Sequence, residues 1–193
     1  MFGIVQPKLE SNLSNWSKIN RYSRWMYNLI SPFVGKRVID IGVGVGNMMQ
    51  FYLPNVEIAI GIDIFDTQLE IVQERFADKV TEGQLVTQLV DIEKDDLSVF
   101  KNYNLDTVIC VNVLEHIKSD LHVVSKIKDI INCGRIILMV PSHSAVYNHM
   151  DKNAGHFRRY DRGDLRAIAE KLDLQVQKNR YFNIFGIVLY YMK

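Results

Sequence analysis

The sequence predicts a doubly wound α/β fold with a mostly parallel sheet, on three observations. Five short runs rich in β-branched residues are almost continuously apolar, which is typical of parallel strands buried on both faces. Helix-sized segments alternate with these runs, as in successive β-α-β units. The 193 residues show no internal repeat and no Pro/Gly-rich linker, so we expect a single domain over residues 1–193.

The predicted elements follow in order along the chain. Residues 9–34 carry apolar and aromatic side chains at steps of mostly three and four, which predicts an amphipathic helix or helix pair ending at Pro32 and Gly35. This divides the domain into an N-terminal helical segment, 1–35, and an α/β core, 36–193. The expected strands are 37–41, 57–63, 84–89, 107–111 and 135–140, and the expected helices are roughly 46–53, 66–79, 119–132 and 161–172.

Composition excludes several classes of protein. A hydrophobic fraction of 48% and a net charge of +1 argue against intrinsic disorder and give no support to binding nucleic acid through overall charge. Two cysteines exclude a disulfide scaffold. The N-terminus lacks the pattern of a signal peptide, and the apolar run at 184–192 is shorter than a membrane span. We therefore expect a cytoplasmic protein.

Three strand ends carry residues suited to a nucleotide-like ligand. The first strand leads into Gly42, Gly44 and Gly46, and glycines at alternate positions let the backbone turn sharply and approach a ligand closely. The second strand ends at Asp63, at the spacing of a carboxylate that accepts both hydroxyls of a ribose. Asp91 follows the third strand, where it could accept a hydrogen bond from an adenine amino group.

A dinucleotide site is the first alternative. Its G-x-G-x-x-G fingerprint, counted from Gly42 and Gly44, requires a third glycine at position 47, where this chain has Asn47. The pattern is instead D-x-G-x-G-x-G, led by Asp40. This spacing disfavours a nicotinamide dinucleotide.

From about residue 20 to residue 186 the chain resembles the class I S-adenosylmethionine (SAM)-dependent methyltransferases. The segment VIDIGVGVGN is similar to the first motif of that family, GIDI to its ribose-binding segment and VDIE to its adenine-side segment. NVLEHI at 112–117, together with AGHFRRYDRGDLRAIA, resembles a bacterial subgroup with a GH-x-RRY segment. The chain departs from the family at its C-terminus, where a predicted sixth strand at 174–181 leaves few residues for the usual antiparallel seventh.

The resemblance implies roles for residues at four strand ends. Gly42, Gly44 and Gly46 would pass under the methionine part of SAM, and Asp40 would order the loop or meet the ammonium group. The other residues that the resemblance assigns to the cofactor are Asp63 and Ile64 for the ribose, Asp91 and Ile92 for the adenine, and Asn112 and Val113 for the sulfonium side. The N-terminal helical segment would close over the cofactor as a lid, with Tyr22 on the acceptor side.

A catalytic base is required only if the acceptor carries a proton that must leave. His116, His156 and Tyr160 are the candidates, and an imidazole titrates close to neutral pH. Arg158 and Arg159 could bind an anionic acceptor or could pair with nearby acids, and the basic stretch 152–180 could orient an anion or simply be a solvated face. We expect no metal site, because no tight cluster of His, Asp and Glu occurs along the sequence.

Three functions therefore remain. The leading one is methyl transfer from SAM to a small-molecule acceptor, with anionic, lipid-linked and sugar-linked acceptors all open. The alternatives are a non-catalytic module that binds SAM or S-adenosylhomocysteine, and an oxidoreductase with a nucleotide cofactor, which Asn47 disfavours.

The end of the chain predicts an association surface. Residues 183–193 are apolar, β-branched and aromatic, and leaving such side chains in water is costly. The sheet edge beside the fifth strand would also expose unpaired backbone groups. We expect this tail to be buried, at a homodimer contact.

Overall fold

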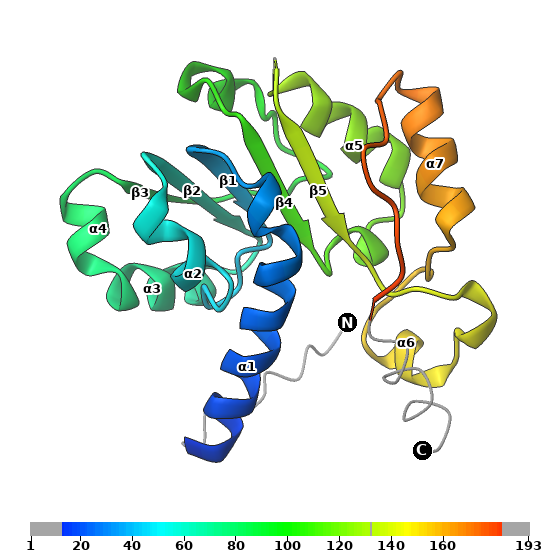
Figure 1. Ribbon diagram of the computed structural model, residues 1–193, viewed down its shortest axis with the longest axis horizontal. Coiled ribbons are helices and arrows are strands. Elements are labelled where there is room, and N and C mark those ends of the chain that lie inside the picture. Colours follow the sequence, from blue (N-terminus) through cyan, green and yellow to red (C-terminus); the bar gives the residue numbers. More distant parts are fainter. Residues whose placement is uncertain (1–12, 132, 183–193) are drawn as a thin grey trace.

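The computed structural model describes residues 13–131 and 133–182 (Figure 1). The described residues form one five-stranded sheet in the order β3-β2-β1-β4-β5, with every pairing parallel. Its strands are β1 (Arg37–Ile41), β2 (Ile58–Asp63), β3 (Leu85–Leu89), β4 (Thr107–Val111) and β5 (Arg135–Met139). The predicted fold class is confirmed, and each strand lies within one residue of its predicted bounds.

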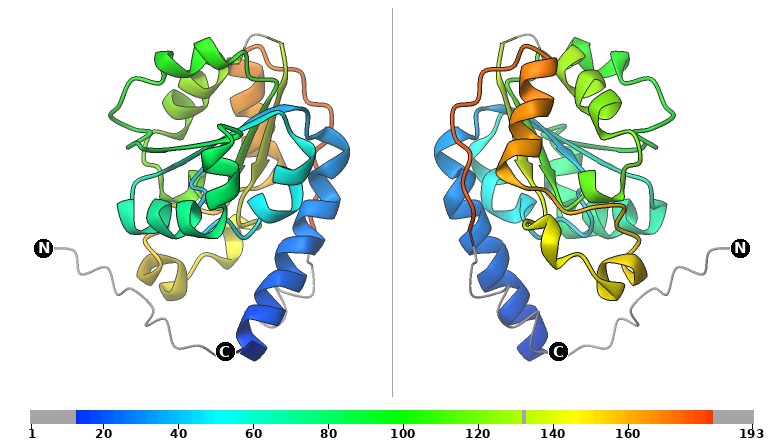
Figure 2. Two further views of the ribbon diagram at one scale, coloured as in Figure 1. Left: turned by 90° about the vertical axis from the view of Figure 1, so that its left-hand side faces the viewer. Right: turned by 90° about the vertical axis from the view of Figure 1, so that its right-hand side faces the viewer.

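Helices fill the intervals between the strands. The α-helices are α1 (Leu13–Ile30), α2 (Met49–Tyr52), α3 (Asp66–Arg75), α4 (Ala77–Thr81), α5 (Asp120–Asp129), α6 (His149–Asn153) and α7 (Arg162–Lys171). The 3-10 turns are η1 (Ser31–Phe33), η2 (Leu53–Asn55), η3 (Ser98–Tyr103), η4 (Leu114–His116) and η5 (Ser144–Val146). Figure 2 shows helices on both sides of the sheet, as a doubly wound fold requires.

Alternating residues of the central strands feed two separate cores. Ile39 and Val108 pack with α5, α7 and η3, whereas Val38 and Ile109 pack with α1, α2 and α3 on the opposite face. All four side chains are fully buried. Burial on both faces explains why these strands read as continuous apolar runs in the sequence.

The carboxyl ends of the strands gather the segments that matter for function. The arrows of β4 and β5 in Figure 1 point toward the end of the molecule where α6 lies and where the N-terminal half of α1 projects. The glycine-containing turn after β1 and the turns after β2 and β4 emerge at this same edge, since all three strands run parallel. Ligands of open α/β sheets bind at such an edge.

The predicted sixth strand at 174–181 is wrong. Residues 174–182 run irregularly and form no strand beside β5, and hydrogen bonds connect them to α7. The Leu174 amide donates to the Ala169 carbonyl, and the Asn179 side-chain amide donates to the Arg162 carbonyl at 3.0 Å. Most side chains here are polar, so a strand with two buried faces would bury groups that lack partners.

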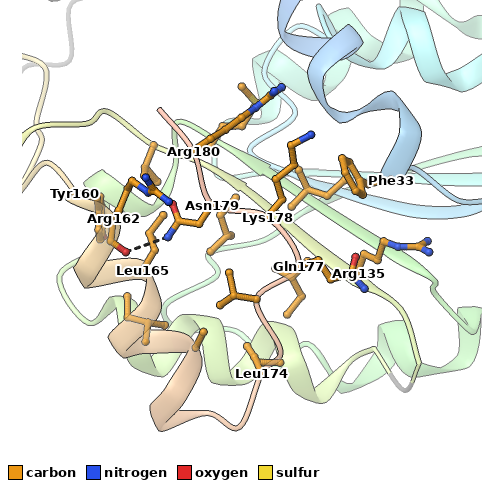
Figure 3. Close-up of a pocket in the computed structure, with 18 of the residues that line it drawn as sticks. Phe33, Arg135, Tyr160, Arg162, Leu165, Leu174, Gln177, Lys178, Asn179 and Arg180 are labelled. Carbon is orange, nitrogen blue, oxygen red and sulfur yellow. Dashed lines mark hydrogen bonds between the residues drawn. The ribbon is translucent and has the colours of Figure 1, made fainter. Parts of the chain in front are cut away.

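A cavity of about 500 Å³ lies where that strand would have been (Figure 3). It is bounded by β5, α7 and residues 174–182, and its lining mixes apolar side chains such as Leu165 and Leu174 with the basic Arg135 and Lys178. The tail at 183–193, with the homodimer contact expected of it, lies outside the described residues. That contact stays a prediction.

Bilayer-spanning segments require both length and sustained apolar character, and none of the helices over 13–131 and 133–182 combines the two.

Candidate functional site

The turn after β1 is built from glycines in left-handed conformations. Gly42, Gly44 and Gly46 have φ angles of 69°, 55° and 75°, a region that other residues rarely adopt. The Gly42 amide donates to the Ile62 carbonyl at 2.8 Å, which ties the turn to the end of β2. From α3, the Arg75 guanidinium donates to the Val45 carbonyl on the other side of the turn. The turn is therefore held in shape from two elements.

The two outer glycines are required by close neighbours, and the middle one is open. A Cβ on Gly42 would lie 2.3 Å from Val113 Cγ2, and one on Gly46 would lie 2.8 Å from the Phe76 ring. At Gly44 the nearest atom is Gln68 Oε1, 3.9 Å away. The open backbone at Gly44 is a cradle that a ligand can approach closely.

Asp63 is fixed at the end of β2 by two backbone donors. Its Oδ2 accepts from the Gly44 amide at 2.9 Å and its Oδ1 from the Phe65 amide at 3.0 Å. The side chain is thus aimed at the glycine turn, as the ribose role predicted from the sequence would need. The next two residues are apolar yet exposed, Ile64 at 56% and Phe65 at 40%, and they offer an apolar surface beside the carboxylate.

Asp91 and Ile92 follow β3 at the same edge of the sheet. Asp91 accepts from the exposed Lys94 ammonium at 2.6 Å, and this hydrogen bond holds the pKa of Asp91 below its usual range. The Ile92 side chain is buried, and its carbonyl accepts from Lys126 at 2.7 Å. Binding an adenine amino group through Asp91 would therefore compete with a surface ion pair.

Asp40 is buried beneath the turn. Its Oδ2 accepts from the Tyr52 hydroxyl at 2.8 Å, which connects β1 to α2. Burial raises the pKa of Asp40 to about 7, against the opposing effect of the Tyr52 hydrogen bond. A cation near this carboxylate would compensate its charge, as expected for the ammonium group of a bound methionine moiety.

The raised pKa of Asp40 predicts a pH-dependent stability. The folded state holds a proton that the unfolded chain releases above about pH 4, so the contribution of Asp40 to stability falls as pH rises from 4 to 7. Without cofactor, Asp40→Asn is expected to exceed the wild type by on the order of 2 kcal/mol at pH 8 and to match it near pH 4. Urea unfolding across this range measures the difference. The exposed Asp66→Asn variant controls for losing one negative charge, and parallel curves for Asp40→Asn and the wild type would contradict the prediction.

The turn after β4 brings the expected sulfonium-side residues to the glycine turn. Asn112 is left-handed, with φ at 54°, and its amide donates to the Met139 carbonyl of β5 at 2.9 Å. Val113 then packs against Gly42. The segment NVLEHI thus starts in direct contact with the glycine turn.

Glu115, His116 and His156 come together just beyond this contact. One ligand-type atom of each lies within 4.8 Å of the others, and the two imidazole rings meet edge to face with centroids 4.7 Å apart. Burial raises the pKa of Glu115 to about 7, and burial together with the neighbouring His156 lowers the pKa of His116. The sequence indicated His116 and His156 as candidates but did not indicate Glu115 as a site residue. It also did not predict that the two histidines lie close together, because 40 residues separate them in the sequence.

The GHFRRY segment is anchored by its charged and aromatic residues. The Arg159 guanidinium donates to both carboxylate oxygens of the buried Asp151 at 2.9 Å. Arg158 pairs with Asp120 and also donates to the Lys118 carbonyl. Both arginines therefore have acidic partners within the chain, and their predicted role in binding the acceptor stays a prediction.

Tyr160 is 2% exposed, and its hydroxyl reaches two internal acceptors, the Leu114 carbonyl at 3.1 Å and Asp120 Oδ2 at 3.0 Å. Burial raises its pKa further above the usual range of a phenol. This geometry connects the segment to η4 and gives no support to Tyr160 as a base, so its catalytic role stays a prediction.

Tyr22 lies in the middle of α1 and is 43% exposed. Its ring contacts Trp25, which contacts Phe182 in turn. The helix is held beside α2 by Gln50, which donates to Asn20. This position, next to the helix that follows the glycine turn, is compatible with the predicted lid, whose closure stays a prediction.

A family model described as a methyltransferase domain matches residues 16–179, which is most of the chain. The chain belongs to this family. The predictions of a class I methyltransferase-like Rossmann fold, of the family and of its cofactor SAM are thereby confirmed. Of the curated proteins, the ubiquinone biosynthesis O-methyltransferase of Paracidovorax citrulli is 24% identical over 77% of this methyltransferase-domain chain. The chain spans 58% of the length of that relative.

Solved structures share the fold of this methyltransferase domain. Magnesium protoporphyrin IX methyltransferase from Synechocystis, solved with bound S-adenosylhomocysteine, has a TM-score of 0.60 at 18% identity and matches 93% of this chain and 84% of its own. The YcgJ protein from Bacillus subtilis has a TM-score of 0.65 at 18% identity, over 90% of this chain and 78% of its own.

Two further residues of the methyltransferase domain shape the glycine turn and were missed from the sequence. Arg75 is the last residue of α3, 30 residues after the carbonyl that it binds, and Tyr52 looks like an ordinary core aromatic. Their polar partners become apparent only when α2 and α3 are packed on the sheet. No periodic signal in the sequence marks either one.

Proposed function

We propose that this chain transfers a methyl group from SAM to a hydroxyl oxygen of a small-molecule acceptor. One observation supports the proposal. At the same edge of the sheet, the open glycine turn after β1 lies near a polar cluster at the end of the neighbouring strand, β4. Gly44 and Asp63 form the cofactor side, and Glu115, His116 and His156 the acceptor side. The O-methyltransferase named as a relative supports oxygen as the receiving atom.

The residues of the chain fit the cofactor in three respects. The backbone at Gly44 is open to close approach, Asp63 is pre-oriented by two amides, and Asp40 offers a buried negative charge below the turn. When bound, SAM supplies a methyl group already activated by its sulfonium. The protein has mainly to align the acceptor and exclude water, and such alignment can provide roughly 7–11 kcal/mol of the barrier.

Proton removal is the remaining task of the protein. A hydroxyl acceptor loses its proton as its oxygen bonds to the methyl carbon, and the electron pair of the broken carbon–sulfur bond goes to sulfur. Part of His116 is open to solvent, and the partial desolvation of its ring together with the neighbouring His156 lowers its pKa, which favours the neutral imidazole. His156 is oriented by Asp151, whose Oδ1 lies 2.9 Å from its Nδ1. Either imidazole can accept the proton.

Transfer of labelled methyl from SAM to a panel of phenols, catechols, sugars and lipid-linked alcohols tests the proposal. We expect label in the products of at least one class, and lower turnover for His156→Ala with SAM affinity within about threefold of the wild type. That split is expected because His156 belongs to the acceptor side, so its loss affects chemistry more than cofactor binding. His122→Ala, at an exposed position on α5, is the control and should behave as the wild type.

The negative outcomes are distinguishable. Tight SAM binding with no transfer to any acceptor would favour the non-catalytic binding module. Failure to bind SAM at all would contradict the proposed function.

A further inference from the structure

Three side chains with metal-ligand chemistry converge at the acceptor side of the site. Glu115 and His116 come from η4, immediately after β4, and His156 comes from the turn that follows α6. One carboxylate oxygen and one nitrogen from each imidazole lie within 4.8 Å of one another. Atoms at such separations can share a single central cation after small side-chain adjustments, because zinc–ligand bonds are about 2.0–2.2 Å long.

Within the described part of the chain, one oxygen of the buried Glu115 carboxylate lacks a hydrogen-bond partner, although the charge of Arg159 opposes the effect of burial on the pKa of this group. The residue is 1% exposed, and its Oε2 atom has no hydrogen-bond partner among the described residues. Burying a carboxylate without a compensating partner is expensive, so native proteins pair such groups or use them to bind metals. The carboxylate faces the two imidazoles, which places a cation between them as the missing partner.

His156 has the orientation of a metal ligand with an outer carboxylate. Its Nδ1 lies 2.9 Å from Asp151 Oδ1, and Asp151 is itself held by the Arg159 guanidinium. This leaves Nε2 as the nitrogen that faces outward from the pair. Histidines that bind metals usually donate their other ring N–H to a carboxylate or a carbonyl in this way, and that contact fixes the ring orientation.

We propose that Glu115, His116 and His156 bind a divalent transition-metal cation of the zinc type, with at least one coordination position open. Two imidazoles and one carboxylate suit zinc or its first-row neighbours, whereas magnesium prefers a shell of oxygens. His116 is exposed, so the open position is accessible from solvent. The expectation of no metal site rested on spacing along the chain, and the three residues meet only after folding.

The role of the cation rests on the proposed function, although its binding does not. An acceptor hydroxyl at the open position would have its pKa lowered by the metal, as water has in zinc enzymes. With the cation bound, the two imidazoles would act as ligands rather than bases, so the hydroxyl would release its proton to solvent. Its oxygen would then attack the methyl carbon, and the electron pair of the carbon–sulfur bond would go to sulfur. This narrows the acceptor class to molecules with a hydroxyl that can coordinate a metal, such as phenols and catechols.

Zinc titration of the chelator-treated full chain, against a competing fluorescent chelator, tests the binding. We expect one zinc ion per chain and a rise in Tm on loading, because a ligand that binds only the folded state stabilises it. His116→Ala and His156→Ala should each weaken binding at least tenfold. The exposed His122→Ala and His149→Ala should bind as the wild type does.

Glu115→Gln separates a ligand from a merely structural residue. The substitution keeps the shape and removes an ionisable group whose buried Oε2 has no hydrogen-bond partner over 13–131 and 133–182, so the metal-free variant is expected to be at least as stable as the wild type. Its zinc affinity should nevertheless fall at least tenfold, and zinc should no longer raise its Tm. Cobalt(II) absorption of the wild type, lost in the same variants, gives a second readout that needs no activity.

The outcomes distinguish this proposal from the proposed function. Absence of zinc binding, or equal binding by the wild type and Glu115→Gln, would overturn the metal site even if methyl transfer is observed without metal. Zinc binding that depends on these residues, in a chain that fails to bind SAM, would leave the metal site standing while the proposed function falls.

Discussion

Asp63→Ala is expected to weaken binding of SAM and of S-adenosylhomocysteine at least tenfold. The carboxylate would lose its hydrogen bonds to the ribose, and charge-assisted bonds contribute about 1.5–3 kcal/mol. It would also lose the bond from the Gly44 amide, so the cradle itself would be less well ordered before binding. Isothermal titration calorimetry with each ligand measures the change.

The matched control is Asp66→Ala, which removes an exposed carboxylate at the start of α3, three residues further along. Its affinity for SAM should stay close to that of the wild type. Equal affinities for the wild type and Asp63→Ala would show that the cofactor is bound elsewhere.

Gly42→Ala is expected to destabilise the fold by roughly 2–5 kcal/mol and to abolish SAM binding at ordinary concentrations. The left-handed conformation at φ 69° costs about 1–2 kcal/mol for alanine. The added Cβ would lie 2.3 Å from Val113 Cγ2, and overpacking of this kind costs typically 1–3 kcal/mol. Val113 is β-branched and stiff, so relief would come from moving the turn itself.

Gly83→Ala isolates the steric part of that effect. Gly83 has nearly the same φ, 72°, but a Cβ there would meet nothing within 4 Å. Its loss of stability should be only the conformational part, and SAM affinity should not change. Urea unfolding together with calorimetry on both variants checks the pair, and similar losses in the two would refute the steric argument at Gly42.

The sheet was predictable because its information is local. Each central strand is buried on both faces, so runs such as 37–41 and 107–111 are mostly apolar, with Asp40 as the buried acidic exception, and are bounded by polar residues or glycine. The left-handed turn after β1 was also predictable, since glycine adopts such a conformation at positions 42, 44 and 46 at the lowest cost. These signals do not depend on what packs against them.

The predicted sixth strand does not form, because whether a strand forms also depends on what lies beside it. Val176 and Leu174 gave residues 174–181 a strand-like appearance, but Asn179 and the Tyr181 hydroxyl hydrogen-bond to Arg162 of α7 instead. The local pattern of side chains indicates which residues can adopt an extended backbone. It does not show whether those residues will pair with the free edge of the sheet. The local sequence therefore could not decide this element.

The acceptor side was predictable only in part. NVLEHI and GHFRRY were each recognised as segments of interest, yet the arrangement of Glu115, His116 and His156 depends on how the loop after β5 folds back. That loop is positioned by Asp151, which accepts from Arg159 and lies beside His156. Contacts over such separations leave no periodic trace in one sequence.

The position of β1 in the sheet has a consequence for how the chain is made. β1 is synthesised before the other four strands of the described sheet, yet it lies at its centre, with β2 on one side and β4 on the other. Its second edge stays without a partner until synthesis has passed Thr107, the first residue of β4. Over that interval the nascent chain carries an apolar strand with one unpaired edge, and unpaired edges of this kind favour wrong pairing and aggregation.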